Sequence, residues 1–330
     1  MFSRRNFLSF DFTRCGAADP DHWVRVHRIA MACRFEVLLH SGGTLDLGAA
    51  RKALDEADRL ESILTVFRDT SEVVRVNRTA AEEDVRVSPD LFELLQLSER
   101  LHQDTAGAFD VTSNPLIRCW GFLRREGRVP EAAVLDEARA CTGMRKVSLD
   151  VDRQTVRFDR PGVELNFGSI GKGFAMDRMA ALLRANGVQH ALLSAGTSSV
   201  VAVGGRGGGW PVDLRPRRAR GRVARVLLRD GAVGTSGAGE QFFEIDGTRY
   251  GHVLDPRTGW PASGVLGVSV IAREAAVADA LSTALLVEGP TLADNYCATH
   301  TDTLVVLVPE SNPERPQVFG SYAGARVELS

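Results

Sequence analysis

The sequence predicts an α+β fold. Segments with the two-residue period of strands and segments with the 3.6-residue period of helices both occur, without the strict strand–helix alternation of a doubly wound sheet. Residues 200–270 are dense in glycine and in short β-like runs, which indicates a meander of strands. The chain has 330 residues, 44% of them hydrophobic and 25% charged, and this is typical of a globular protein with a large core.

The first elements that we expect are a strand and two helices. Residues 24–40 alternate and are rich in valine, isoleucine and phenylalanine, which favours a strand. Residues 47–67 carry apolar side chains at helical spacing, so they are expected to form a long amphipathic helix. Residues 90–105 have the same period, and Ser88 followed by Pro89 is a helix start signal.

The second half of the chain mixes both kinds of element. Residues 146–159 read as a hairpin that turns at Asp152 and Arg153, and residues 163–187 as a strand, a glycine loop and a helix that Gly187 ends. The remaining predictions are a helix over residues 275–287, a short helix near Thr291, and closing strands within residues 301–309 and 317–330.

Charge and cysteine content narrow the possible partners. The net charge is −2 and the isoelectric point about 6.4, so no basic field favours nucleic acid or an anionic membrane. The arginine-rich residues 215–222 have few aromatic neighbours and are expected to form a solvated loop. No apolar run reaches the roughly 20 residues of a membrane span. The five cysteines are scattered and form no C-x-x-C pair, so neither a disulfide framework nor a cysteine metal site is expected.

The N-terminus resembles an export signal only in part. Residues 3–10, "SRRNFLSF", look like a twin-arginine signal, but polar and charged residues follow where an apolar stretch and a small-residue cleavage site belong. We therefore divide the chain into an N-terminal segment, residues 1–22, and a single domain, residues 23–330. The compartment of the protein stays open. The protein is expected in the cytoplasm if this segment is not an export signal.

A glycine loop precedes the helix expected near residue 171. In "NFGSIGKGFAMD", residues 166–177, glycines let backbone N–H groups approach a phosphate, and the helix N-terminus adds partial positive charge. Lys172 stands where it could bind a diphosphate. The pattern matches neither common phosphate-loop motif, and a plain strand-to-helix turn explains it equally well.

Two further stretches concentrate polar residues. "GAFDVTSNPLIRCWGF", residues 107–122, places Asp110 and Thr112 near Asn114, although such residues also stabilise ordinary turns. Residues 234–261 gather hydroxyl groups around His252. A lone histidine is more often structural, but the density of polar groups here favours a site.

The apolar helix expected over residues 275–287 carries Asp279 and Thr283 on one face, because residues four apart lie side by side. A buried carboxylate needs a partner. Carboxylate and hydroxyl oxygens suit a hard cation such as Mg²⁺. The alternative is an aspartate bonded to a neighbouring loop and a threonine bonded to its own helix backbone.

Together these segments resemble the ApbE family of FAD:protein FMN transferases. The resemblance runs from about Met31 to the end of the last helix. It is carried, in chain order, by "MACRF", "GAFDVTSNPL", "NFGSIGKGFAMD", "TSG", "HVLDPRTGWP" and "ADALSTALLV".

The resemblance implies an ApbE-like, T-fold-like architecture with largely antiparallel sheets and packed helices, and a Mg²⁺-dependent transfer of FMN from FAD to a threonine or serine of an acceptor protein. His252 would be the base that deprotonates the acceptor hydroxyl. Asp279, Thr283 and an oxygen of Ser169 would hold Mg²⁺. The implied FAD contacts are Met31, Ala108, Phe109, Asp110, Asn166, Lys172 and Leu254. The family usually acts in the periplasm or otherwise outside the cytoplasm.

Three positions depart from the family pattern. Asn166 stands where aspartate is usual, Ser198 and Ser199 replace an acidic residue, and Gly251 precedes His252 in place of serine. These departures keep a second hypothesis open, a relative that binds or hydrolyses FAD without transfer to a protein. A third, an interaction domain without a ligand, leaves the Asp279 and Thr283 pair unexplained.

Overall fold

The structure is a computed structural model that describes residues 8–9, 23–40, 46–205, 207–215, 221–239 and 241–330. The twin-arginine pair and Cys15 lie outside the described residues, as does most of the arginine-rich segment 215–222. Within the described ranges, no helix combines the length and apolarity that crossing a membrane requires.

The helices of the described residues lie in two stretches of the chain, residues 47–185 and residues 275–299. They are α1 (Leu47–Leu64), α2 (Glu72–Thr79), α3 (Pro89–Asp104), α4 (Asn114–Cys119), α5 (Ala132–Ala140), the short 3₁₀ helix Met144–Lys146, α6 (Gly171–Ala185), α7 (Ala275–Glu288) and α8 (Pro290–Thr299).

The strands form four sheets, and every pairing between named strands is antiparallel. The eight-stranded sheet has the order β16-β15-β14-β11-β8-β7-β3-β2, with β2 (Trp23–Ala30), β3 (Cys33–His40), β7 (Ala191–Ala195), β8 (Ser199–Val203), β11 (Gly231–Gly237), β14 (Val265–Ala272), β15 (Thr303–Pro309) and β16 (Gln317–Ser321). A four-stranded sheet has the order β1-β9-β10-β17, with β1 (Leu8–Ser9), β9 (Trp210–Leu214), β10 (Ala224–Leu228) and β17 (Ala325–Leu329). The small sheets are β4-β6-β5 (Val85–Arg86, Thr155–Phe158, Val147–Asp150) and the hairpin β12-β13 (Phe242–Ile245, Thr248–Gly251).

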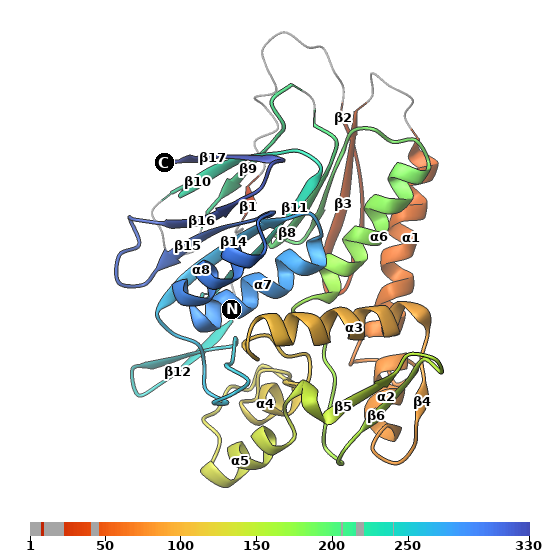
Figure 1. Cartoon of the computed structure of the whole chain (residues 1–330), viewed down its shortest axis with the longest axis vertical. Helices are drawn as coiled ribbons and strands as arrows, with labels where there is room; N and C mark the ends of the chain where they lie inside the picture. The colour runs from red at the N-terminus through yellow and green to blue at the C-terminus, as the bar shows by residue number, and fades with distance from the viewer. Residues whose placement is uncertain (1–7, 10–22, 41–45, 206, 216–220, 240) are drawn as a thin grey trace.

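The large sheet is covered on both faces. Helices α1, α6 and α7 pack on one face, and the four-stranded sheet lies over the other (Figure 1). All residues of β14 are buried, because alternation turns Val268 and Val270 toward the helices and Ile271 toward the second sheet. A register shift between Val265 and Gly267 interrupts the alternation, and Leu266 therefore also faces the second sheet. The mixture of helices with antiparallel sheets confirms the α+β prediction.

Two glycines allow α7 to lie unusually close to its neighbours. A Cβ atom on Gly173 of α6 would lie 2.2 Å from the carbonyl oxygen of Ala275, and one on Gly234 of β11 would lie 2.4 Å from the carbonyl carbon of Ala278. Only glycine permits such backbone contact. Helix α7 is therefore held directly against both α6 and the sheet.

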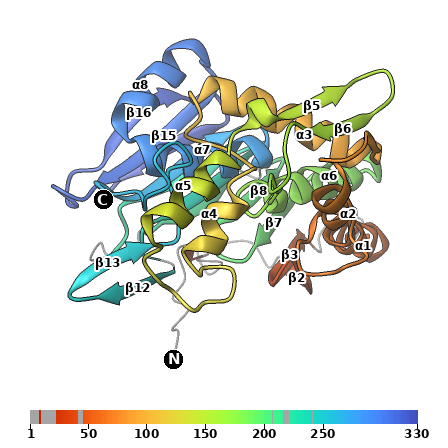
Figure 2. The same cartoon turned by 90° about the horizontal axis from the view of Figure 1, so that it is seen from below.

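Around the layered body, α4, α5 and the hairpin β12-β13 gather at one end (Figure 2). A separate apolar cluster forms there around Trp120, whose indole N–H donates to the carbonyl of Gly259 at 2.8 Å. The rings of Tyr250 and Trp260 lie 5.5 and 5.2 Å from the Trp120 ring. This cluster anchors the loop that follows β13.

Several expectations hold and some are wrong. The helices over residues 47–67, 90–105 and 275–287 are present as α1, α3 and α7, and the 146–159 hairpin is present as β5 and β6. The single strand over residues 24–40 is wrong, because Met31 and Ala32 adopt φ of 48° and 56° and turn the chain into the hairpin β2-β3. The strand before the glycine loop is also wrong: residues 163–167 contain only an isolated bridge at Glu164. The backbone of Leu165 bonds to the Asn77 side chain of α2. The N–H of Asn166 donates to the carbonyl of Val111 in the α3–α4 loop. Helices α2, α4 and α5 were not expected.

Candidate active site

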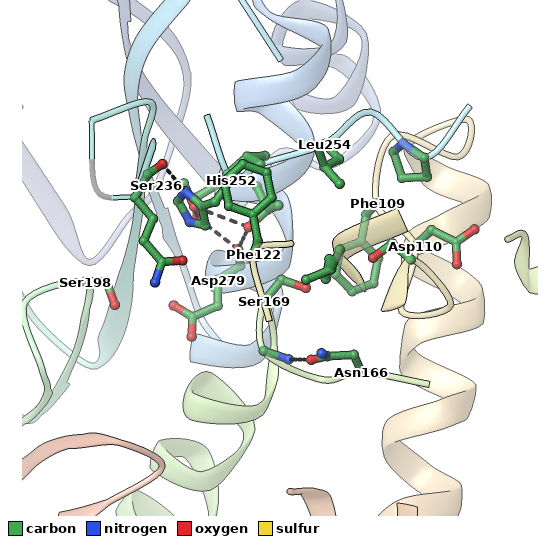
Figure 3. Close-up of a pocket in the computed structure, with 18 of the residues that line it drawn as sticks. Phe109, Asp110, Phe122, Asn166, Ser169, Ser198, Ser236, His252, Leu254 and Asp279 are labelled. Atoms are coloured by element: carbon green, nitrogen blue, oxygen red, sulfur yellow. Dashed lines mark hydrogen bonds between the residues drawn. The ribbon is translucent and has the colours of Figure 1, made fainter. Parts of the chain in front are cut away.

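A cavity of about 390 Å³ opens where α6 and α7 meet the loops around them. Figure 3 shows Ser236, His252 and Asp279 toward one side of it, Phe109 and Asp110 toward the other, and Asn166 below. The lining comes from segments between Phe67 and Thr283, far apart in the chain. The lining elements include the α3–α4 loop, α4 and the segment after it, the glycine loop, the first turn of α6, β11, the loop after β13, and α7.

The glycine loop forms part of the wall and leads directly into the first turn of α6. The Asn166 carboxamide oxygen accepts from the backbone N–H of Gly168 at 2.9 Å, and the Asn166 N–H donates to the carbonyl of Val111 at 2.7 Å. These bonds fix the loop against the α3–α4 segment. Lys172, in the first turn of α6, lines the cavity and makes no hydrogen bond or ion pair with any other described residue. Its ammonium group is available for an anion.

Asn166 also ends a chain of directed hydrogen bonds. Its amide nitrogen donates to the Asn114 carboxamide oxygen at 2.8 Å, and the Asn114 amide donates to a Glu164 carboxylate oxygen at 2.7 Å. Glu164 is in turn paired with Arg118. Each link runs from donor to acceptor, so the chain suits an amide rather than a carboxylate at position 166.

Asp279 is buried at the junction of α6 and α7. One carboxylate oxygen accepts from the backbone N–H of Gly173 at 2.8 Å, and the other accepts from the Ser199 hydroxyl at 2.8 Å. The Gly173 N–H belongs to the first turn of α6, where the helix dipole stabilises negative charge. Ser199 thus donates a hydrogen bond to Asp279, at the segment where the resemblance led us to expect an acidic residue.

Three hydroxyl groups continue this polar patch along α7. The Ser236 hydroxyl contacts Ser282 Oγ at 2.8 Å and Thr283 Oγ1 at 3.2 Å. Thr283 also donates to the carbonyl of Asp279 at 3.3 Å. The alternative to a metal site predicted that Asp279 bonds to a neighbouring element and that Thr283 bonds to its own helix backbone. Both kinds of contact are present. They do not exhaust the oxygen lone pairs, which can still face a cation.

The donor set fits a hard cation only together with a charged ligand. Asp279, Thr283 and Ser169 line the same cavity, and they offer one carboxylate, a hydroxyl and a further oxygen. Among the described residues, no group of three or more His, Cys, Asp or Glu side chains could hold a metal ion alone. Mg²⁺ commonly binds one or two carboxylates and completes its shell with water and substrate phosphates. A diphosphate in the cavity would supply the missing charge.

Ala108, Phe109 and Asp110 form the opposite wall. The Asp110 carboxylate accepts from the Thr112 N–H at 2.8 Å, the Thr112 hydroxyl at 2.5 Å and the Met144 N–H at 3.2 Å. It also lies 3.2 Å from Nδ1 of His102. This carboxylate is 1% exposed, so it shapes the wall through internal bonds.

The environment of His102 changes its titration. Burial alone lowers the pKa of His102, but the hydrogen bond and negative charge of Asp110 outweigh it, and the net effect raises that pKa. Because the pKa of His102 is higher in the folded protein than in the unfolded chain, protonated His102 stabilises the fold. This stabilisation is fully present at pH values below the pKa of the unfolded chain. That contribution is lost as pH rises through the raised value.

His252 follows β13 and lines the cavity near Phe122, with ring centroids 6.5 Å apart. Its Nδ1 lies 3.2 Å from the carbonyl oxygen of Gln241. A carbonyl only accepts, so Nδ1 carries the proton and the lone pair resides on Nε2. This is the tautomer that a general base at Nε2 requires. Leu254, two residues on, packs in the Trp120 cluster and pairs with Pro261 in an isolated bridge.

Ten of the eleven residues predicted for the site line this one cavity. Met31 is not among the lining residues: it is half-buried in the β2-β3 turn, packed against the main core, and its contact with FAD stays a prediction. Ser282 was missed, although its position three residues after Asp279 places it on the same helix face. Phe67, Phe122, Arg125 and Gln241 also line the cavity, and no sequence pattern pointed to them.

Comparison with known proteins gives a consistent result. The family model described as the ApbE family matches residues 31–308. An FAD:protein FMN transferase of Klebsiella pneumoniae is 31% identical over 265 residues, which cover 78% of this chain and 75% of the relative. One from Vibrio cholerae is 32% identical over 282 residues, covering 83% and 84%. The crystal structure of the ApbE protein from Thermotoga maritima matches with a TM-score of 0.81 at 28% identity, covering 91% of this chain and 97% of that one.

Proposed function

This chain belongs to the ApbE family, and from that premise we propose that it is an FAD:protein FMN transferase that acts with a divalent cation. Its substrates are FAD and a protein that presents a threonine or serine hydroxyl. The products are the flavinylated protein and AMP. The single observation that carries the proposal is the meeting of Lys172, Asp279, Thr283 and His252 in one cavity.

The reaction is a phosphoryl-group transfer. The acceptor oxygen attacks the phosphorus of the FMN half, a new P–O bond forms, the diphosphate bond breaks, and AMP leaves. The hydroxyl proton goes to Nε2 of His252, because Nδ1 already donates to the carbonyl of Gln241. Lys172 and the N–H groups of the first turn of α6 stabilise the diphosphate charge.

Asp279, Thr283 and Ser169 are the residues that would hold Mg²⁺. When bound, the ion neutralises diphosphate charge and orients the phosphoryl group. The chain's own contribution is a carboxylate kept in place by Gly173 and Ser199, at the end of the glycine loop. These contacts hold the Asp279 carboxylate beside the first turn of α6, which also carries Lys172, and this supports the proposed metal site.

The test is an assay of the purified protein with FAD and Mg²⁺, with and without EDTA, in which AMP and FMN are followed by chromatography. The acceptor is a protein that carries covalent FMN in its mature form, supplied unmodified. AMP release that needs both the metal and the acceptor, with covalent fluorescence on the acceptor, supports the transferase. AMP and free FMN in the absence of acceptor would favour an FAD hydrolase, and FAD that stays intact would favour a carrier.

Two variants assign the roles. His252→Ala is expected to keep FAD binding and to lose transfer by at least about 100-fold, the usual contribution of a positioned base. His300→Ala, outside the cavity at the end of α8, is the matched control and should behave as the unchanged protein. Asp279→Ala should lose the metal-dependent part of FAD binding while it remains folded. Normal turnover by His252→Ala, or equal FAD affinity of Asp279→Ala with and without Mg²⁺, would contradict these roles.

A further inference from the structure

A second cavity, of about 290 Å³, adjoins the first one at Asp110 and Pro256, which line both. Its walls come from the end of α3, the α3–α4 loop, α5, the segment that follows α5, and the loop after β13. Lys172, His252 and Asp279 line the first cavity and do not line the second. The second cavity is therefore a separate compartment beside the proposed FAD site.

The titratable side chains that line this second cavity are mainly cationic. They are His102, Arg139, Arg145 and Arg257, and among the described residues Asp110 is the one acidic side chain in the lining. The Asp110 carboxylate is 1% exposed and is already bonded within the wall. The lining therefore favours an anion over a cation.

Two of the arginines are held by acids that do not line the cavity. Arg257 pairs with Asp255 at 2.9 Å and with Glu288 at 2.5 Å. Arg139 lies 3.5 Å from Asp136 and donates to the carbonyl of Arg257 at 3.2 Å. These contacts fix the two guanidinium groups and offset much of their charge. The positive charge available to a ligand must come from the other cations.

Gly107 keeps the cavity open between His102 and Arg257. A Cβ atom on Gly107 would lie 3.4 Å from Cε1 of His102 and 3.7 Å from Cγ of Arg257. Nδ1 of His102 donates to the carbonyl of Phe109 at 3.0 Å, and Nε2 makes no hydrogen bond with a described residue. Although burial lowers the pKa of His102, the hydrogen bond and charge of Asp110 raise it above its ordinary value. Protonated His102 presents an N–H at Nε2 to a ligand.

Gly143 leaves a similar space beside Lys146 and Arg145. A Cβ atom on Gly143 would lie 3.7 Å from Nζ of Lys146 and 3.8 Å from Cγ of Arg145. Lys146 is only 9% exposed, and its ammonium group makes no hydrogen bond or ion pair with a described residue. The same holds for the guanidinium of Arg145, which is exposed. A buried ammonium without a partner costs free energy, so this place favours an anion beside it.

We propose that the second cavity binds a phosphate group, either as free inorganic phosphate or as part of a phosphomonoester. The groups that bind it are Nε2 of His102, the guanidinium of Arg145 and the ammonium of Lys146. Arginine and lysine are common phosphate ligands, and three cations around one cavity suit a dianion better than a singly charged carboxylate. The site goes beyond the proposed function, because it needs neither FAD nor an acceptor hydroxyl.

Isothermal titration calorimetry of the full-length protein with potassium phosphate tests the proposal. The titration is done without Mg²⁺ and is compared with potassium chloride of equal ionic strength. Phosphate is expected to bind saturably, and Arg145→Gln should weaken it at least about tenfold, as for the loss of a charge-assisted hydrogen bond. Arg153→Gln, in the β5–β6 turn outside the cavity, changes the net charge equally and should keep the affinity.

Lys146→Met is a second variant, which removes the ammonium group and keeps an unbranched side chain. It should also weaken phosphate binding at least about tenfold. Its midpoint of thermal unfolding without phosphate should stay the same or rise, because a buried ammonium without a partner destabilises the fold. A lower affinity together with a lower midpoint would contradict the role proposed for Lys146.

Phosphate bound in the FAD cavity would give the opposite pattern. Lys172→Gln should keep the phosphate affinity, because Lys172 lines only the first cavity. A phosphate signal that is lost in Lys172→Gln and kept in Arg145→Gln overturns the proposal. The absence of saturable binding overturns it too, as does equal weakening by Arg145→Gln and Arg153→Gln.

Titrations with AMP and adenosine distinguish the two sources of the phosphate group. AMP that binds more tightly than inorganic phosphate, with the same dependence on Arg145, indicates a phosphomonoester. AMP that binds no more tightly indicates free phosphate. Adenosine has no phosphate, and adenosine binding that depends on Arg145 would contradict the assignment of this side chain to a phosphate group.

Discussion

At the scale of single residues, one amide shows how a departure from a family pattern is accommodated. Asn166 donates to Asn114, and Asn114 donates to Glu164. An aspartate at position 166 would place two acceptors together at one link. Turning the Asn114 amide around would only move the conflict to Glu164. The asparagine at position 166 is thus coupled to Asn114 and Glu164 through hydrogen bonds, and it is more than the replacement of a charged side chain by a neutral one.

Asn166→Asp is therefore expected to lower the free energy of unfolding by about 1–3 kcal/mol, the cost of a polar group left without its partner. Equilibrium unfolding in urea measures this change in the free energy of unfolding. In a Glu164→Gln background the same change should cost less, because the amide introduced by that substitution can donate to a turned Asn114. A double-mutant cycle with no coupling between the two positions would contradict this account.

At the scale of elements, α6 and α7 cap each other. Helix α7 has no hydrogen bond from the side chain of its own cap residue, Glu274. The Asp177 carboxylate of α6 instead accepts from the N–H groups of Ala275 and Ala276 at 2.8 and 2.9 Å. Asp279 of α7 in turn accepts from Gly173 in the first turn of α6. This reciprocal contact sets the position of Asp279 relative to the glycine loop.

Asp177→Ala is expected to destabilise the protein by about 1–2 kcal/mol, as for the loss of an N-cap. It should also raise the Mg²⁺ concentration needed for half-maximal FAD binding, because the start of α7 is released. Asp177→Asn keeps an oxygen acceptor and should restore much of both properties. Destabilisation with an unchanged Mg²⁺ requirement would mean that Asp177 supports the fold without positioning the metal ligand.

At the scale of the whole molecule, the cavity joins segments that the sheet order brings together. Strands β8, β11 and β14 are neighbours in the large sheet, and α7 packs across β11 and β14. A ligand that spans this junction binds only the folded state. Such binding stabilises the protein by about 2.7 kcal/mol at a free concentration 100 times Kd.

FAD with Mg²⁺ is accordingly expected to raise the midpoint of thermal unfolding by several degrees, and EDTA should remove most of the increase. Riboflavin, which lacks the diphosphate, is the control ligand and should give a smaller, metal-independent shift. Differential scanning fluorimetry of apo protein, read from tryptophan emission, provides the measurement. An equal shift with FAD in EDTA would argue against a metal at Asp279.

The sequence was most informative where a pattern is local. The 3.6-residue period located α1, α3 and α7, and the polar pair on α7 pointed to one face. The β2-β3 turn was missed because Met31 and Ala32 adopt left-handed backbone angles that residues with side chains rarely take. The α4 helix was missed because it spans only Asn114–Cys119, too short for a periodic signal.

By itself, the sequence determined the kinds of elements, the apolar faces they bury, and the side chains able to bind a diphosphate and a cation. These follow from local periodicity and from the chemistry of each side chain. Only the tertiary structure decided that Ser199 bonds to Asp279, that Asp177 caps α7, and that Asn166 bonds to Asn114. Those contacts join residues that are dozens of positions apart, and they depend on strand order and close helix packing, which no local pattern encodes.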